Sequence, residues 1–173
     1  MKLIEAMKKE KQLLEKATDL RQKIRDHSAF LDFETPVYPD QQAQVSGWLQ
    51  SHSDVLKEVL DLREGIQRTN LQTMVTIDIN GKAVTKSIAA WIHRRRQLAD
   101  LEQQAWQGLT DRNLKEALLR ESTGKEREIK IVRCYDPKER DSKTEVFRTE
   151  PTTVDATLEV VNATTDVVPD LPF

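Results

Sequence analysis

A repeat of apolar side chains between residues 45 and 66 constrains the fold of this chain more than any other feature. Its positions follow alternating steps of three and four residues, and six of the seven are apolar. They are Val45, Trp48, His52, Val55, Val59, Leu62 and Ile66. That spacing favours coiled-coil-like packing of one helix face against another helix. The carboxylate of Asp40, just before the repeat, can accept hydrogen bonds from the unpaired amides of a first turn.

The partner of this helix is predicted over residues 2–29, where apolar side chains recur at helical spacing among good helix formers. The apolar positions are Leu3, Ala6, Leu13, Ala17, Leu20 and Ile24. This helix should stop before Pro36 and Pro39, because residues that precede proline disfavour helical geometry. About ten residues then join the two helices, which predicts an antiparallel helical hairpin.

The period changes to two after residue 70. Residues 74–79 alternate and are rich in β-branched side chains, and they lead into Asn80-Gly81, the favoured pair for a two-residue hairpin turn. We therefore expect a β-hairpin over residues 74–85. Because a lone two-stranded ribbon is barely stable, it should pack on the helices or on another subunit.

A third helix is predicted from about Lys86 to Leu109, and Asp111 can cap a shorter helical continuation that ends near Gly124. Alternation then predicts a strand over residues 128–135, which a second strand over 144–148 would join across a polar loop. A short last helix is expected after Thr152 or Thr153. The tail 168–173 holds two prolines and cannot continue it.

The predicted fold is therefore mainly α: a long antiparallel helical hairpin plus a third helix, with a small β-hairpin and a short β element in the C-terminal third. We expect a helical domain over residues 1–125. A β-containing arm with a short terminal helix should follow over residues 126–173.

Charge and targeting patterns exclude several classes of partner. The 27 basic and 29 acidic residues leave a net charge of −2, which gives no bulk attraction to nucleic acid or acidic lipid. No apolar run is long enough for a membrane span or a signal peptide, so we expect a cytoplasmic protein, or a virion component if the gene belongs to a phage. The single cysteine, Cys134, excludes an internal disulfide framework and is expected to be a buried thiol.

No pattern of catalytic residues stands out. His27, His52 and His93 fall on three different predicted helices, and none has a ligand-type spacing. Residues 81–87 lack the first glycine of a phosphate loop. Residues 94–96 are three arginines that point in different directions on a helix, which predicts a solvated, salt-bridged face. We predict no enzyme activity, and no catalytic, cofactor-binding or metal-binding residue.

Packing anchors are easier to identify. Trp48, Trp91 and Trp106 lie at apolar positions of long helices, where they should anchor helix contacts within the chain or between subunits. His52 interrupts the apolar repeat, and we interpret it as a polar residue that fixes helix register. The alternative is a pH switch or a ligand site in a pocket between helices near His52.

Several short motifs resemble the septicolysin-like family of small bacterial proteins. They occur in the family's order over nearly the whole chain, as Met1–Ala6, Gln67–Asn70, Glu128–Arg133, Val154-Asp155 and Asn162–Thr165. The resemblance implies a helical, oligomeric protein without agreed catalytic residues. Where the family has a continuous helix before the last motif, Pro137, Pro151 and residues 144–148 favour loop and strand here. Asn70 and Asn162 are singled out as amides that bond backbone at helix ends.

Apolar stripes on three long helices exceed what a single copy would cover. The leading hypothesis is a non-enzymatic subunit of a symmetric homo-oligomer whose partner is itself. A more specific form is a phage or virion structural component that contacts other virion proteins. The alternatives are a ligand-binding or enzymatic helical module near His52 and, third, a septicolysin-type membrane-acting toxin. No cofactor, nucleic-acid or membrane partner is expected.

Overall fold

A computed structural model describes residues 1–168 of the chain, and its fold is mainly α, as predicted. The chain divides into two compact units. Unit 1 holds Met1–Met74, Ser87–Ala89 and, among the described residues, those from Leu158 to Val168. Unit 2 holds Val75–Lys86 and Ala90–Thr157. The elements are α1 (Leu3–His27), α2 (Gln41–Gln72), β1 (Met74–Ile79), β2 (Lys82–Ser87), α3 (Ile88–His93), the π-helical segment η1 (Arg94–Leu98), α4 (Ala99–Gln107), β3 (Ala117–Arg120), β4 (Glu126–Ile129) and α5 (Pro137–Thr164).

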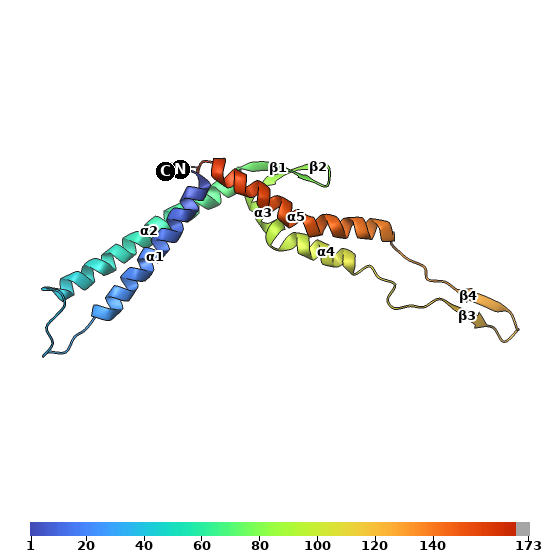
Figure 1. Cartoon of the computed structure of the whole chain (residues 1–173), viewed down its shortest axis with the longest axis horizontal. Coiled ribbons are helices and arrows are strands. Elements are labelled where there is room, and N and C mark those ends of the chain that lie inside the picture. Colours follow the sequence, from blue (N-terminus) through green and yellow to red (C-terminus); the bar gives the residue numbers. More distant parts are fainter. Residues whose placement is uncertain (169–173) are drawn as a thin grey trace. The chain divides into compact units, whose positions relative to one another are not determined.

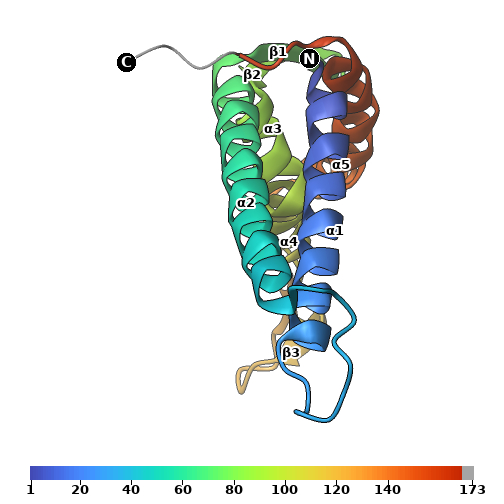
Figure 2. The ribbon, with the colours of Figure 1, turned by 90° about the vertical axis from the view of Figure 1, so that its left-hand side faces the viewer.

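The antiparallel hairpin of α1 and α2 is confirmed, and the two helices lie side by side in both ribbon views (Figures 1 and 2). The predicted seam forms the core of unit 1. Its buried members are Ala6, Leu13, Ala17, Leu20, Trp48, Val55, Val59 and Leu62. Asp40 caps α2 as expected, because its Oδ1 accepts the backbone N–H of Ala43 at 2.9 Å. None of the helices within residues 1–168 is long and apolar enough to cross a membrane.

The start of α1 is tied to the segment that follows α5. The backbone N–H of Leu3 donates to the carbonyl of Thr165, and that of Val167 donates to the carbonyl of Met1, both at 2.9 Å. The amide of Val168 in turn donates to Oγ1 of the fully buried Thr69. A Cβ at Gly65 would stand 3.1 Å from a methyl carbon of Val167, so a larger residue there would crowd this contact. These bonds satisfy backbone groups that would otherwise lack partners at a helix terminus.

The first β-hairpin is confirmed at its predicted place. Asn80 and Gly81 adopt φ values of 54° and 78°, the left-handed geometry that a type I′ turn requires. Val75 and Ile77 are buried. The indole N–H of Trp91 donates to the carbonyl of Val75 at 3.0 Å, so this hairpin packs on the helix that follows it.

The predicted third helix is also confirmed, but it contains a π-helical turn that the sequence pattern does not predict. Helical geometry runs through α3, η1 and α4, and within η1 the N–H of Ala99 bonds the carbonyl of Arg94, five residues back. That bond adds one residue to a turn. The predicted helical continuation after Asp111 is wrong. Arg112 and Asn113 have positive φ, which ends regular helix, and Ala117–Arg120 form a strand instead.

The predicted strand over residues 128–135 and its partner over 144–148 are wrong as well. β4 covers only Glu126–Ile129 and pairs antiparallel with β3, while residues 137–164 form one long helix, α5, in place of a short terminal one. Tertiary burial of Glu150, Val154 and Leu158 on one side outweighs the β preference of its Thr and Val residues. The carboxylate of Asp136 accepts the N–H of Lys138 at 2.9 Å and so caps the helix start.

A buried ion pair holds η1 against α5 within unit 2. Both carboxylate oxygens of Glu150, a side chain only 4% exposed, accept bonds of 2.6 Å from Arg94. The guanidinium also reaches Glu102, and it stands 5.7 Å from the ring centre of Phe147. Bidentate charge-assisted bonds of this kind are among the strongest in proteins. Arg94 and Arg95 are therefore paired, as predicted for the basic run, but Arg94 is largely buried rather than solvated.

We expect Glu150→Gln to lower the free energy of unfolding by about 3 kcal/mol, because it removes the buried carboxylate that pairs with the Arg94 guanidinium and leaves only the more exposed Glu102 as its opposite charge. Denaturant unfolding followed by circular dichroism measures this. The matched control is Asp155→Asn, which breaks the Arg95–Asp155 pair at a carboxylate that is well exposed, and it should cost less than about 1 kcal/mol. Equal effects of the two variants would contradict this role of the Arg94–Glu150 pair.

Candidate functional site

The predicted anchor Trp48 lies in an aromatic cluster at the end of the α1–α2 pair where the connecting loop joins the helices. Its ring centre stands 5.4 Å from that of His27 and 5.3 Å from that of Tyr38, the latter edge-on. Gln41 closes the cluster: its amide donates to the carbonyl of His27 at 2.9 Å and its oxygen accepts the N–H of Val37 at 3.1 Å. Trp48 therefore anchors the loop within one copy of the chain.

A cavity of about 460 Å³ opens beside this cluster. Its lining comes from the end of α1, the loop and the first turns of α2, as His27, Ser28, Ala29, Phe30, Gln41, Gln42, Val45 and Ser46. His52, which is half-buried, does not line it, although the alternative interpretation of the sequence placed a pocket near that residue. Among residues 1–168, no group of three His, Cys, Asp or Glu side chains converges as a metal site would require.

The other predicted anchors occupy different environments. Trp91 is 1% exposed and holds the first β-hairpin, whereas Trp106 on α4 is only half-buried. Asn70 and Asn162 are half-buried too, and across the described residues no hydrogen bond of either side-chain amide joins them to a helix end. The neighbouring Thr69 performs that role instead, through its bonds to the carbonyl of Gly65 and to Val168.

The α1–α2 pair carries a second apolar stripe outside its core. On α2, Leu49, Leu56 and Leu60 are seven and four residues apart, share a helix face and are 45–55% exposed. On α1, Met7 and Leu14 form a similar stripe. Helical periodicity places each stripe about a quarter turn from the buried seam. Because the helices are antiparallel, the two stripes flank the seam on the same side. We call these five residues the leucine face.

Two ion pairs between α1 and α2 show on which side of the helix pair the leucine face lies. The Arg63–Glu10 pair, with an Nε–Oε1 distance of 2.7 Å, bridges α2 and α1 on the side of the leucine face. The Lys9–Glu58 pair bridges them on the opposite side, at the shallow cavity lined by Gly65, Val167 and Val168. One side of the pair is therefore contacted by the chain after α5, while the leucine face stays open.

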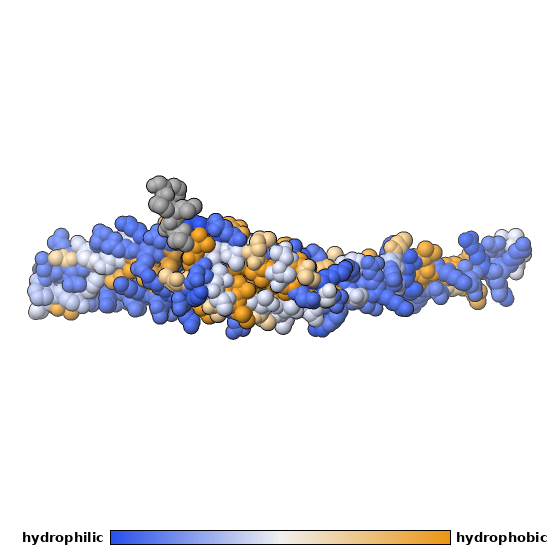
Figure 3. Space-filling model, turned by 90° about the horizontal axis from the view of Figure 1, so that it is seen from above, coloured by the Kyte–Doolittle hydropathy of each residue, from blue (hydrophilic) through white to orange (hydrophobic). Residues whose placement is uncertain are grey.

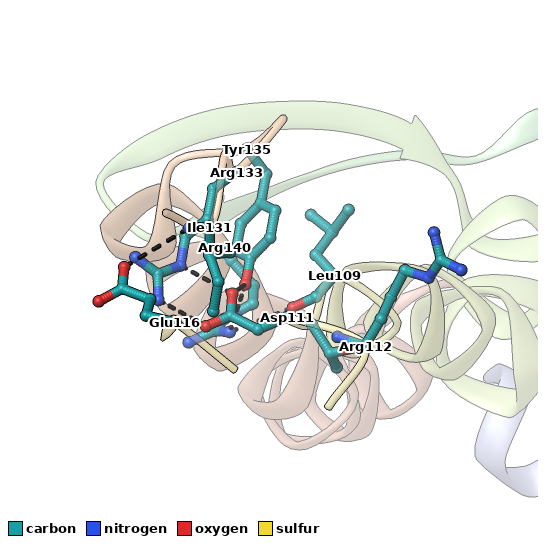
Figure 4. A network of polar contacts seen from close by, with 9 residues as sticks. Leu109, Asp111, Arg112, Glu116, Ile131, Arg133, Tyr135 and Arg140 are labelled. Atoms are coloured by element: carbon teal, nitrogen blue, oxygen red, sulfur yellow. Dashed lines mark hydrogen bonds and ion pairs between the residues drawn. The ribbon is translucent and has the colours of Figure 1, made fainter. Parts of the chain in front are cut away.

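Unit 2 contains a polar network that the sequence did not predict, at the base of the β3–β4 hairpin (Figure 4). Asp111 is its centre: its two carboxylate oxygens accept a bidentate pair of bonds from Arg133, at 2.7 and 2.5 Å. Oδ1 also accepts the hydroxyl of Tyr135 at 3.0 Å. Arg140 from α5 donates to the carbonyl of Leu109 at 3.1 Å and lies over the Tyr135 ring. The network joins the two chain segments that lead into and out of the hairpin.

We call the network of Asp111, Arg133, Tyr135 and Arg140 the clamp, because its bonds hold together the two chain segments that flank the β3–β4 hairpin. The guanidinium of Arg133, together with the Tyr135 hydroxyl, holds the pKa of Asp111 below its usual range, so the carboxylate stays charged near neutral pH. A cavity of about 310 Å³ adjoins the network, with Cys134 at its edge. That cysteine is exposed and lies outside any strand, so the predicted buried thiol is wrong.

We expect the clamp to weaken only at strongly acidic pH. A carboxyl whose pKa is lower in the folded chain contributes stability above its unfolded pKa, and loses it as the pH falls through the folded value. The NMR signal of the Arg133 Nε–H, which donates to Asp111, should keep its chemical shift down to the ordinary pKa of aspartate, 3.8, and change below it. Asp111→Asn should change that signal at neutral pH, whereas Asp100→Asn on α4 should not. An unchanged Arg133 signal in Asp111→Asn would contradict the clamp.

Comparison with known proteins identifies the fold and no activity. No family model matches the chain, and no curated protein does. A solved structure does: a functionally unknown conserved protein from Corynebacterium diphtheriae is similar over 97% of this chain and 99% of its own length, with a TM-score of 0.56 and 20% sequence identity. Nearly the whole chain therefore has the fold of a conserved bacterial protein.

Proposed function

We propose that this chain is a non-enzymatic assembly subunit that forms a symmetric homo-oligomer through its helices. The observation that carries the proposal is the leucine face, where five apolar side chains of α1 and α2 remain between about a third and a half exposed. Completing the burial of each would contribute about 1 kcal/mol. A second copy supplies a matching apolar surface, because a two-fold contact uses the same patch on both subunits.

The exposed area of the chain supports the same proposal. The total is 12906 Å². Even two separate compact domains of half this mass would together expose only about 10,500 Å². Association is a common way for such a chain to cover more of its surface.

The finer hypotheses rest on sequence alone. The septicolysin-like resemblance favours a bacterial oligomer, and a virion component is the more specific form of an assembly subunit. Genes for capsid or tail proteins beside this one would support the virion form. An isolated chromosomal locus would count against it.

A ligand-binding module is the second candidate, because the cavity of about 460 Å³ lies against the His27–Tyr38–Trp48 cluster. Thermal-shift measurements with divalent metals and with nucleotides test it. A shift that His27→Leu abolishes and His52→Leu leaves intact would favour this candidate. The absence of any shift would leave assembly as the proposal.

We expect light scattering to give a mass of two or more whole multiples of 20.0 kDa. The double variant Leu56→Glu/Leu60→Glu should shift this mass towards the monomer while the helical circular dichroism stays unchanged, because two carboxylates cannot be buried unpaired in an apolar contact. Val160→Glu, at an exposed apolar position on α5, is the matched control and should keep the oligomer. A monomeric wild-type chain would overturn the proposal.

A further inference from the structure

Neither face of the β3–β4 hairpin is buried against another part of the described chain. Every residue of Ala117–Arg120 and Glu126–Ile129 is exposed, on both faces of the ribbon. Leu118 is 68% exposed, and Leu119 and Ile129 also show large apolar surfaces. Figure 3 shows apolar side chains among hydrophilic ones in this part of the chain. A two-stranded ribbon with this exposure is marginally stable in water, and three or more strands are the usual remedy.

The hydrogen-bond pattern shows which backbone groups of the hairpin are free. The N–H of Glu121 donates to the carbonyl of Lys125 at 2.9 Å, so these two residues form a hydrogen-bonded pair next to the turn. Hydrogen-bonded and non-bonded pairs alternate along an antiparallel ladder. With the observed register, Leu119 and Ala117 also direct their backbone groups inward, to β4. Leu118 and Arg120 therefore direct theirs outward, along the open edge of β3.

From this edge we infer a specific partner: β3 of a second copy of this chain, paired antiparallel about a two-fold axis at Leu118. The inference rests on the proposed homo-oligomer and names one of its contacts. In that register Leu118 faces Leu118 of the second copy, and the outward backbone groups of both strands meet. Glu116 then faces Arg120 of the second copy, twice, so the charges are complementary.

The side chains concerned are available for such a contact. Arg120 is 82% exposed and bonds Glu126 at 3.0 Å, while Glu116 is exposed and has a long contact of 3.5 Å to the N–H of Ile131. Opposite charges that face each other across strands stabilise a ladder. The pairing also sets Ala117 opposite Leu119 of the second copy, which joins the apolar sides of the two hairpins into one face of a four-stranded sheet.

The open edge of β4 is a poorer surface for the same association. Its outward residues are Glu126, Glu128 and, one position beyond the strand, Lys130, so a two-fold axis at Glu128 sets Glu128 against Glu128 of the second copy and Glu126 against Lys130. Like charges directly opposite each other destabilise a ladder. Pairing through β4 therefore sets two glutamates at the axis, where pairing through β3 sets two leucines, and this makes β3 the better edge.

Disulfide trapping tests the register. In a Cys134→Ser background, Leu118→Cys sets two thiols in a pair whose Cα atoms stand about 5.5 Å apart, within the range that a disulfide bridges. We expect mild oxidation to convert most of the chain to a covalent dimer. Leu119→Cys is the matched control: its Cα atoms would stand about 8 Å apart, so it should give several-fold less dimer.

Charge exchange tests the pairing partner. Glu116→Arg added to the Leu118→Cys chain should lower the dimer yield several-fold. The further changes Arg120→Glu and Glu126→Arg restore both the contact within the hairpin and the contact between copies, so they should restore the yield. No recovery would overturn the pairing.

Light scattering separates this inference from the proposed function. An oligomer in which Leu118→Cys forms no more dimer than Leu119→Cys would overturn the β3 pairing and leave the assembly proposal standing. A monomeric chain would overturn both. Circular dichroism of each variant, matched to wild type, excludes loss of the helical fold as the cause.

Discussion

The packing of α1 against α2 is the contact on which unit 1 depends. A helix pair can bury only one face of each helix, and here the small Ala6 and Ala17 lie in the same buried seam as Trp48 and three β-branched or leucine side chains of α2. The seam fixes the rotation of both helices about their axes. Once that rotation is set, Gly65 and Thr69 face the segment after α5, and the leucine face is left exposed to solvent. The open surface is thus a consequence of the core.

Features that depend on residues close together in the chain, such as an apolar helix face, a cap or a tight turn, could be predicted from the sequence. The apolar repeat of α2, the Asp40 cap and the Asn80-Gly81 turn each depend on residues close together in the chain, so their geometry follows from neighbours alone. The predicted anchors divide by the same logic. Trp48 and Trp91 lie on the buried faces of such patterns, whereas Trp106 lies near the end of its helix and stays half-buried.

The stretch from residue 111 to 148 could not be predicted in this way, because distant contacts decide it. Asp111 meets Arg133, 22 positions away, and Tyr135, 24 positions away, and neither spacing leaves a local signature. One local pattern does indicate the beginning of α5. Asp136-Pro137 is a favoured helix start, because a capping carboxylate is followed by a proline at the first helical position. The prediction of a strand over 144–148 rested instead on the β-rich composition of those residues.

The π-helical segment has a consequence for how this chain can change in evolution. Each residue turns a helix by about 100°, so removing one residue between Arg94 and Leu98 would restore an ordinary turn and rotate everything after it by that angle. Trp91 would keep its place under the first hairpin, but Trp106 would be carried to another side of its helix. Insertions and deletions should therefore be rare here and tolerated far more readily in the loop between α1 and α2.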